Sequence, residues 1–181
     1  MSDDRLTSRD WVNAGLKALA KTGFTALKAD TLSKTLGVSR GSFYWHFADV
    51  GAFHAAVLLR WREVAYENVV REVEDTPENR LTALLERAFR ADVRLERAVR
   101  SWATVEPRAK AMVEAVDARR LKYIRSLLAE AGLASAQASA RARILYWAYL
   151  GHGLSANAPD PAEWRRILDE FARLATASKT G

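Results

Sequence analysis

The segment Gly37-Val-Ser-Arg-Gly-Ser-Phe-Tyr-Trp-His-Phe47 constrains the fold more than any other part of the chain. In a helix that begins near Ser39, Phe43 and Phe47 lie four residues apart and share one face. A helix this short does not persist alone in water, so its apolar side must pack against other helices. The other side carries Ser, Arg, Ser, Tyr and His, a donor-rich set suited to phosphates and base edges.

The residues before this segment predict a helix-turn-helix. Ser8 to Thr22 place apolar residues at a helical period, and Gly23 follows as a stop signal. Asp30 to Leu36 predict a second short helix, which Gly37 ends before the turn into the third. The alternative is a small core helix with a few exposed polar groups, which would not require a glycine turn directly before it.

The remaining sequence predicts helices only. A long helix from Asp49 to about Glu74 leaves the N-terminal module, and Pro77 and Pro107 interrupt the later pattern. Further helices are expected over residues 78–95, 96–104, 108–131, 135–154 and 161–177. We therefore predict an all-α protein with a three-helix DNA-binding domain at residues 1–48. Residues 49–181 would form an all-helical domain for effector binding and dimerisation.

Charge is distributed unevenly along the chain. Residues 1–48 contain seven Lys and Arg against four Asp and Glu, a net charge of +3. Residues 49–96 have a net charge of −3, and residues 97–181 a net charge of +6. A basic N-terminal segment beside an acidic middle suits a small nucleic-acid-facing module on a body that does not bind DNA.

The sequence lacks the motifs of an enzyme, a metalloprotein or a membrane protein. It has no cysteine and three histidines, and it contains no HExxH, no GxSxG and no glycine loop for phosphate. We expect no catalysis, no metal and no cofactor. The polar first seven residues lack the apolar core of a signal peptide, and the longest uncharged run is too short to span a bilayer. Together with the missing cysteines, these features favour a cytoplasmic protein.

The last two predicted helices are candidates for self-association. Residues 135–154 are apolar around most of the helix, and such a helix must be buried on more than one side. The alternative is that both helices complete the core of a monomer. The expected dimer-interface residues are Tyr149, Leu150, Trp164, Leu168 and Phe171.

The first 47 residues resemble the tetracycline-repressor-like (TetR) family of bacterial transcriptional regulators. The resemblance rests on Arg9, Ala14, Gly23, Leu32, Gly37-Val38-Ser39 and the run Gly41-Ser42-Phe43-Tyr44-Trp45-His46-Phe47. It covers about a quarter of the chain; the remainder matches only in expected architecture. In the family, the body binds a small molecule and dimerises through its last two helices, and the protein acts on DNA in the bacterial cytoplasm and nucleoid.

The resemblance implies a role for each polar residue of the third helix. Ser39, Arg40 and Ser42 would lie at the major groove, and Gly41 would let the backbone approach the DNA. Arg40 is our candidate for base readout, because a guanidinium can bond guanine O6 and N7 together.

Other residues would contact the DNA backbone. Tyr44 and His46 would bond phosphates, as would Lys28 before the second helix. Trp45 would stack at the groove or brace the first helix. The sequence departs from the family at Ala48-Asp-Val-Gly51, where the family commonly has a lysine that contacts phosphate.

Aromatic residues of the body are candidates for an effector pocket, although aromatics at helical spacing are more often core. The expected pocket residues are Trp61, Phe89, Trp102, Met112, Tyr123, Tyr146 and Trp147. The expected function is that of a dimeric repressor released from an inverted-repeat operator in double-stranded DNA by a small-molecule effector. The alternative is a constitutive dimeric DNA binder whose C-terminal domain binds no ligand.

Overall fold

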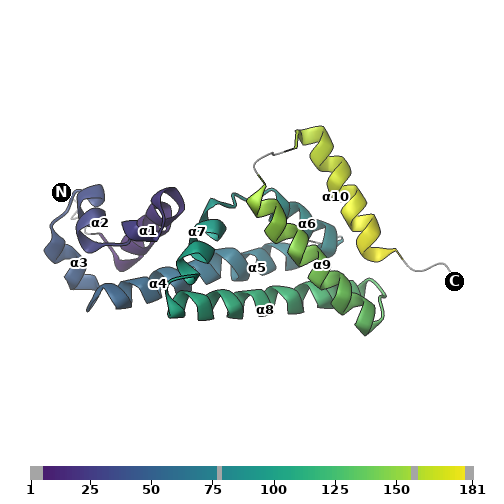
Figure 1. Ribbon diagram of the computed structural model, residues 1–181, viewed down its shortest axis with the longest axis horizontal. Coiled ribbons are helices and arrows are strands. Elements are labelled where there is room, and N and C mark those ends of the chain that lie inside the picture. Colours follow the sequence, from purple (N-terminus) through teal and green to yellow (C-terminus); the bar gives the residue numbers. More distant parts are fainter. Residues whose placement is uncertain (1–5, 77–78, 156–158, 178–181) are drawn as a thin grey trace. The chain divides into compact units, whose positions relative to one another are not determined.

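A computed structural model describes residues 6–76, 79–155 and 159–177. Over these residues the regular structure is helical and contains no β-strand, which confirms the predicted all-α class (Figure 1). The elements are α1 (Ser8–Thr22), a 3-10 turn η1 (Phe24–Ala26), α2 (Ala29–Leu36), α3 (Arg40–His46), α4 (Val50–Arg62), a π-helical turn η2 (Glu63–Glu67), α5 (Asn68–Glu74), α6 (Arg80–Phe89), α7 (Arg94–Ala103), α8 (Pro107–Glu130), α9 (Ser135–Leu154) and α10 (Pro161–Thr176).

The predicted helix from Asp49 to Glu74 is a continuous helical segment, in which a π-helical turn separates the α-helices α4 and α5. Asp49 caps its start, its Oδ1 atom accepting a hydrogen bond of 2.7 Å from the backbone N–H of Ala52. The π-helical turn at residues 63–67 then inserts extra backbone. Phe53 and Trp61, which precede this turn, are buried, whereas Val64 within it is only half-buried.

The chain divides into two compact units, residues 1–65 with 93–114 and residues 66–92 with 115–181. In the first unit α7 packs against α1 and η1. Trp102 of α7 stacks on Phe24 with ring centroids 5.0 Å apart, and His54 lies edge-on to Trp102 at 5.2 Å. The first unit thus contains α4, α7 and the start of α8 besides the three N-terminal helices. The functional division at residue 48 stays a prediction.

The second unit has its own hydrophobic core. α6 packs against α5, α9 and α10. Arg141 of α9 donates hydrogen bonds to the carbonyl oxygens of Ala175 and Ala177, which ties α9 to the C-terminal end of α10. The buried core residues are Leu81, Leu85, Phe89, Leu127, Leu128, Leu133, Ala138, Ala142, Leu145, Leu168 and Ala175.

Candidate nucleic-acid interface

The turn between α2 and α3 follows from one glycine. Gly37 has φ +69°, in the left-handed region where residues other than glycine are strained. The following N–H of Val38 donates to the carbonyl of Ser33 at 3.0 Å, which closes the end of α2. α3 begins two residues later. Ser39 occupies its N-cap position, so the helix begins where the sequence predicts, although the side chain of Ser39 makes no capping hydrogen bond.

Phe43 fixes α3 to the module. Its side chain is fully buried, with its ring edge-on to Trp11 of α1 at 5.4 Å and to Phe53 of α4 at 5.3 Å between centroids. Phe47 is also buried and lies 5.1 Å from the ring of Phe53. The two phenylalanines therefore form the apolar side of α3, as the sequence predicted, and the polar side remains available to solvent.

The residues predicted to bind DNA lie at this available side of α3 and beside the start of α2. Trp45 is the most exposed of the aromatic ones, at 75 %, and Tyr44 is 44 % exposed. Ser42 and His46 are half-buried. Lys28, Ser39, Arg40 and Gly41 are exposed. The structure brings these α3 residues onto one short helix, and their contact with DNA stays a prediction.

Arg40 is held by two neighbours. Its Nε lies 3.2 Å from Oδ1 of Asp30 in α2, and its Nη2 donates a hydrogen bond of 3.1 Å to the hydroxyl of Tyr44. The guanidinium also lies 5.5 Å from the centroid of the Tyr44 ring. The hydrogen bond to Tyr44, followed by the charge of Asp30, raises the pKa of Arg40. The sequence carries no signal for this contact, because Asp30 lies ten positions before Arg40 and only the packing of α2 against α3 brings the two side chains together.

Gly51, which follows the cap of α4, now has a steric explanation. A Cβ atom at this position would lie 3.1 Å from Oδ1 of Asp49 and 3.6 Å from Nη1 of Arg108. A side chain at position 51 would therefore require the capping carboxylate of Asp49 to shift by a few tenths of an ångström. Arg108, in the first turn of α8, brings a cation to the start of α4, where the sequence itself has no basic residue.

The residues predicted to line an effector pocket divide between the two units. Trp61, Trp102 and Met112 belong to the first unit; Trp61 and Trp102 are each 1 % exposed. Phe89, Tyr123, Tyr146 and Trp147 belong to the second unit. In the second unit Phe89 and Tyr146 are buried, whereas Trp147 is 61 % exposed. Their joint role in a pocket stays a prediction.

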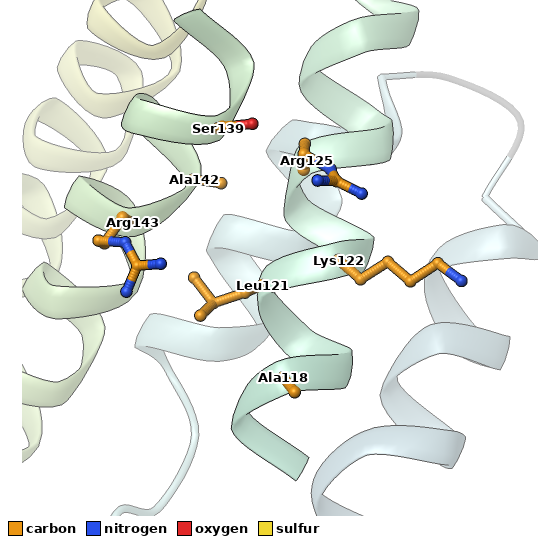
Figure 2. A pocket seen from close by; sticks show the side chains of 7 residues that line it. All are labelled: Ala118, Leu121, Lys122, Arg125, Ser139, Ala142 and Arg143. Carbon is orange, nitrogen blue, oxygen red and sulfur yellow. The ribbon is translucent and has the colours of Figure 1, made fainter. Parts of the chain in front are cut away.

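A groove of about 300 Å³ lies between α8 and α9, within the second unit. Its walls combine apolar surface with basic side chains and include none of the predicted pocket residues. Figure 2 shows Leu121 directed toward α9, and Lys122 extending from the other side of α8. The lining residues are Ala118, Leu121, Lys122, Arg125, Ser139, Ala142 and Arg143. Among the described residues, none of those that line the groove is acidic, so its charge suits an anionic ligand.

The residues predicted to form a dimer interface occupy the second unit. Leu168 is 3 % exposed and lies in the core of the unit itself, with Tyr149, Trp164 and Phe171 partly buried against that core. Leu150 is half-buried. The apolar surface that α9 exposes comes from other residues, Ile144 at 58 %, Trp147 at 61 % and Leu154 at 76 %.

Two further structural properties bear on function. No helix of the described residues is long and apolar enough to cross a membrane. Across that same part of the chain, no group of three or more His, Cys, Asp or Glu side chains is arranged to hold a metal ion.

Comparisons with known proteins agree with this geometry. Residues 12–49 match the model of the bacterial regulatory proteins of the tetR family. No curated protein sequence matches the chain. The fold is similar to that of a proposed transcriptional regulator from Pseudomonas aeruginosa PAO1, with a TM-score of 0.70, 18 % identity and coverage of 96 % of this chain and 94 % of that one.

It is also similar to the fold of a transcriptional regulator from Rhodococcus sp. Rha1, with a TM-score of 0.71, 17 % identity and coverage of 94 % of both chains. These two likenesses concern the fold alone. The family match spans α1 from Val12 onward, α2, α3 and the loop to α4, and so includes the buried Phe43 and the exposed Arg40 of α3. Residues 12–49 therefore form a helix-turn-helix segment that matches the tetR family of bacterial regulatory proteins.

Proposed function

We propose that this chain is a sequence-specific repressor of transcription that binds an inverted-repeat operator as a homodimer and leaves it when a small-molecule effector binds. One observation carries the proposal: within the family-matched segment, α3 is fixed by Phe43 and presents its polar residues on the opposite side. A short helix held in this way has the size and the donors to enter a major groove.

The donors of α3 divide into two roles. Arg40, in the first turn, would read a base, since its planar fork matches guanine O6 and N7. Tyr44, His46 and Lys28 would position the module on phosphates. The Tyr44 hydroxyl accepts from Arg40 and still has its own hydrogen to donate to a phosphate oxygen. Ser39 and Ser42 would bond groove edges, and Gly41 would allow close approach of the backbone.

Dimerisation is supported by the apolar surface of α9. Ile144, Trp147 and Leu154 follow one another at spacings of three and seven residues, so they share one helical face. They are each more than half exposed, and a soluble chain gains by burying such a face against a second copy. A two-fold dimer would place two α3 helices against two half-sites, which gives an operator with inverted symmetry.

Effector release is supported by the groove between α8 and α9. Arg125 and Arg143 make no ion pair among the described residues, and Leu121 and Ala142 supply apolar wall. An amphipathic anion, such as an aromatic or aliphatic carboxylate, would satisfy both kinds of surface. A ligand releases the operator only if it binds the free state more tightly than the DNA-bound state.

Selection of binding sites from a random duplex library tests the DNA-binding part. The purified protein, at moderate salt, is expected to recover an inverted repeat. Recovery of a single unrepeated half-site would contradict the dimeric operator. Recovery of nothing above background would contradict sequence-specific binding by the chain alone.

Titration of the operator complex tests the effector part. A panel of monocarboxylates of increasing apolar length would be added to wild type and to Arg143→Ala, and fluorescence of the tryptophans recorded beside operator affinity. Saturable release that Arg143→Ala weakens is expected. If no compound changes either signal, the chain is a constitutive binder whose body serves as a dimeriser.

A further inference from the structure

Asp30 places a negative charge beside the helix that would meet DNA. Its side chain is 62 % exposed, and its Oδ1 lies 3.2 Å from Nε of Arg40, whose side chain is 61 % exposed. An ion pair this open to solvent contributes little to folding. A carboxylate near phosphates also opposes DNA binding, since like charges repel. Attraction to DNA therefore does not explain this carboxylate. Its place in the first turn of α2 suits the helix dipole, but that accounts for a negative charge in the turn and not for its contact with Arg40.

The geometry around Arg40 suggests a different use. A guanidinium has five N–H donors, of which Asp30 engages Nε and Tyr44 engages one on Nη2. Three donors, two of them on Nη1, remain for DNA. The side chain is thus held at its Nε edge and by the aromatic ring, with the Nη end available for a two-point contact with a base.

We propose that Asp30 is a positioning residue that sets sequence discrimination by holding Arg40 for base readout and away from phosphates. This inference rests on the proposed function of α3. On random DNA, a phosphate that approaches the free donors of Arg40 also approaches the Asp30 carboxylate, and the repulsion between the two anions offsets much of the attraction. At a guanine, the Nη donors of Arg40 bind the base while the Asp30 carboxylate stays beside Nε. The base contact is therefore gained without loss of the ion pair.

The test compares wild type with Asp30→Asn on two duplexes of equal length, the selected operator and a random sequence, over a range of salt concentrations. Removing the carboxylate charge frees Arg40 for phosphates. Affinity for random duplex should rise about three- to tenfold, and its salt dependence should steepen by about one phosphate contact. Affinity for the operator should change by less than about twofold, so that the ratio of the two affinities falls.

Three control variants separate this role from general electrostatics. Glu114→Gln removes one exposed negative charge whose ion-pair partner is Lys110, at 3.8 Å, and should leave the ratio unchanged. Asp30→Glu keeps the charge and should retain most of the wild-type ratio. In an Arg40→Ala background, Asp30→Asn should no longer strengthen binding to random duplex, because the residue through which it acts is absent.

Two results would overturn the inference while the proposed function stands. One is an operator-selecting wild type whose discrimination ratio Asp30→Asn leaves unchanged. The other is an equal gain on random duplex with and without Arg40. A wild type that prefers no duplex over any other would overturn the proposed function and this inference together. The melting temperature of each variant verifies that the folded protein is being compared.

Discussion

Two helices of this chain, α3 and α9, expose aromatic side chains to solvent, and their surroundings differ. On α3, Tyr44 and Trp45 are accompanied by hydroxyl, guanidinium and imidazole groups. On α9, Trp147 is accompanied by Ile144 and Leu154, which are also exposed and apolar. The aromatic rings themselves are similar, so the neighbouring side chains distinguish the two surfaces.

The difference shows how an exposed tryptophan should be interpreted. Hydrogen-bond donors around an exposed aromatic ring favour binding to nucleic acid. The donors bond phosphates and base edges while the ring packs against a sugar or a base. Aliphatic neighbours suit another protein surface, since they add only apolar area to be buried. This contrast supports the two proposals made above, that α3 binds DNA and that the outer face of α9 binds a second copy of the chain.

The largest effect should come from placing the same charge on each helix in turn. Trp147→Asp buries two like charges across a two-fold axis and removes the largest apolar side chain of the α9 face, so the dimer dissociation constant should rise at least about 100-fold. Analytical ultracentrifugation measures it. Trp45→Asp is the matched control: it should leave the dimer intact and weaken DNA binding. Exchange of these two phenotypes would reverse the assignment.

A second test separates the core from the interface within α10. Leu168→Ala should lower the free energy of unfolding by about 2–5 kcal/mol, because Leu168 is 3 % exposed in the core of the second unit. Denaturant titration measures the change. Leu174→Ala, on the same helix but 59 % exposed, should change it by less than about 0.5 kcal/mol. A dimer that dissociates in Leu168→Ala without loss of stability would favour the sequence-based interface.

On the α3 side, Arg40→Ala should reduce operator affinity by about one to two orders of magnitude and relax the preference at one base pair. Binding-site selection with the variant measures both. Tyr44→Phe should weaken all duplexes by similar factors, because it removes the proposed phosphate contact. It should retain most of the preference, because the aromatic ring and Asp30 still hold Arg40. An Arg40→Ala variant that loses random and operator duplex equally would show that Arg40 binds the backbone only.

The smallest expected effect concerns the acid stability of the second unit. Glu74 accepts hydrogen bonds of 2.6 Å from the Tyr123 hydroxyl and from Nη1 of Arg80. The bond from Tyr123, followed by that from Arg80, lowers the pKa of Glu74. A lowered folded-state pKa means that the stabilisation is complete above the usual carboxyl value and is lost as the pH falls below it.

As the pH is lowered from 7 to 3, the melting temperature should therefore fall less steeply in Glu74→Gln than in wild type, because glutamine does not titrate. Glu86→Gln is the control, since Glu86 is exposed on α6 and makes no ion pair in the described part of the chain. Equal acid slopes in wild type and Glu74→Gln would show that the bonds from Tyr123 and Arg80 do not lower the pKa of Glu74 in solution.

Several features of the site could be predicted from the sequence because they depend on local spacing. The four-residue interval between Phe43 and Phe47 defines the buried side of α3, and Gly37 marks the turn before it by its left-handed φ. Helix α9 begins and ends where its apolar pattern does. Helix α6 is shorter than predicted, because it ends at Phe89 and α7 begins at Arg94.

Other features had no local signal. The hydrophobic pattern of the sequence does not predict the π-helical turn at residues 63–67, since the apolar spacing continues through it. The position of Trp102 beside Phe24 required α7 to pack on α1 across 70 residues of intervening chain. Asp30 and Arg40 likewise meet only because two helices cross, and a charge by itself carries no information about a partner on another element.

The sequence by itself therefore determined the all-α class, the helix-turn-helix and the side of α3 that faces solvent, since periodicity and a glycine turn act over a few residues. Only the tertiary structure decided which apolar side chains of α9 and α10 are core and which are exposed. An apolar residue is equally suited to either place, and the choice depends on where the neighbouring helices pack. Leu168 and Trp147 are the clearest pair, one enclosed by its own chain and the other still uncovered.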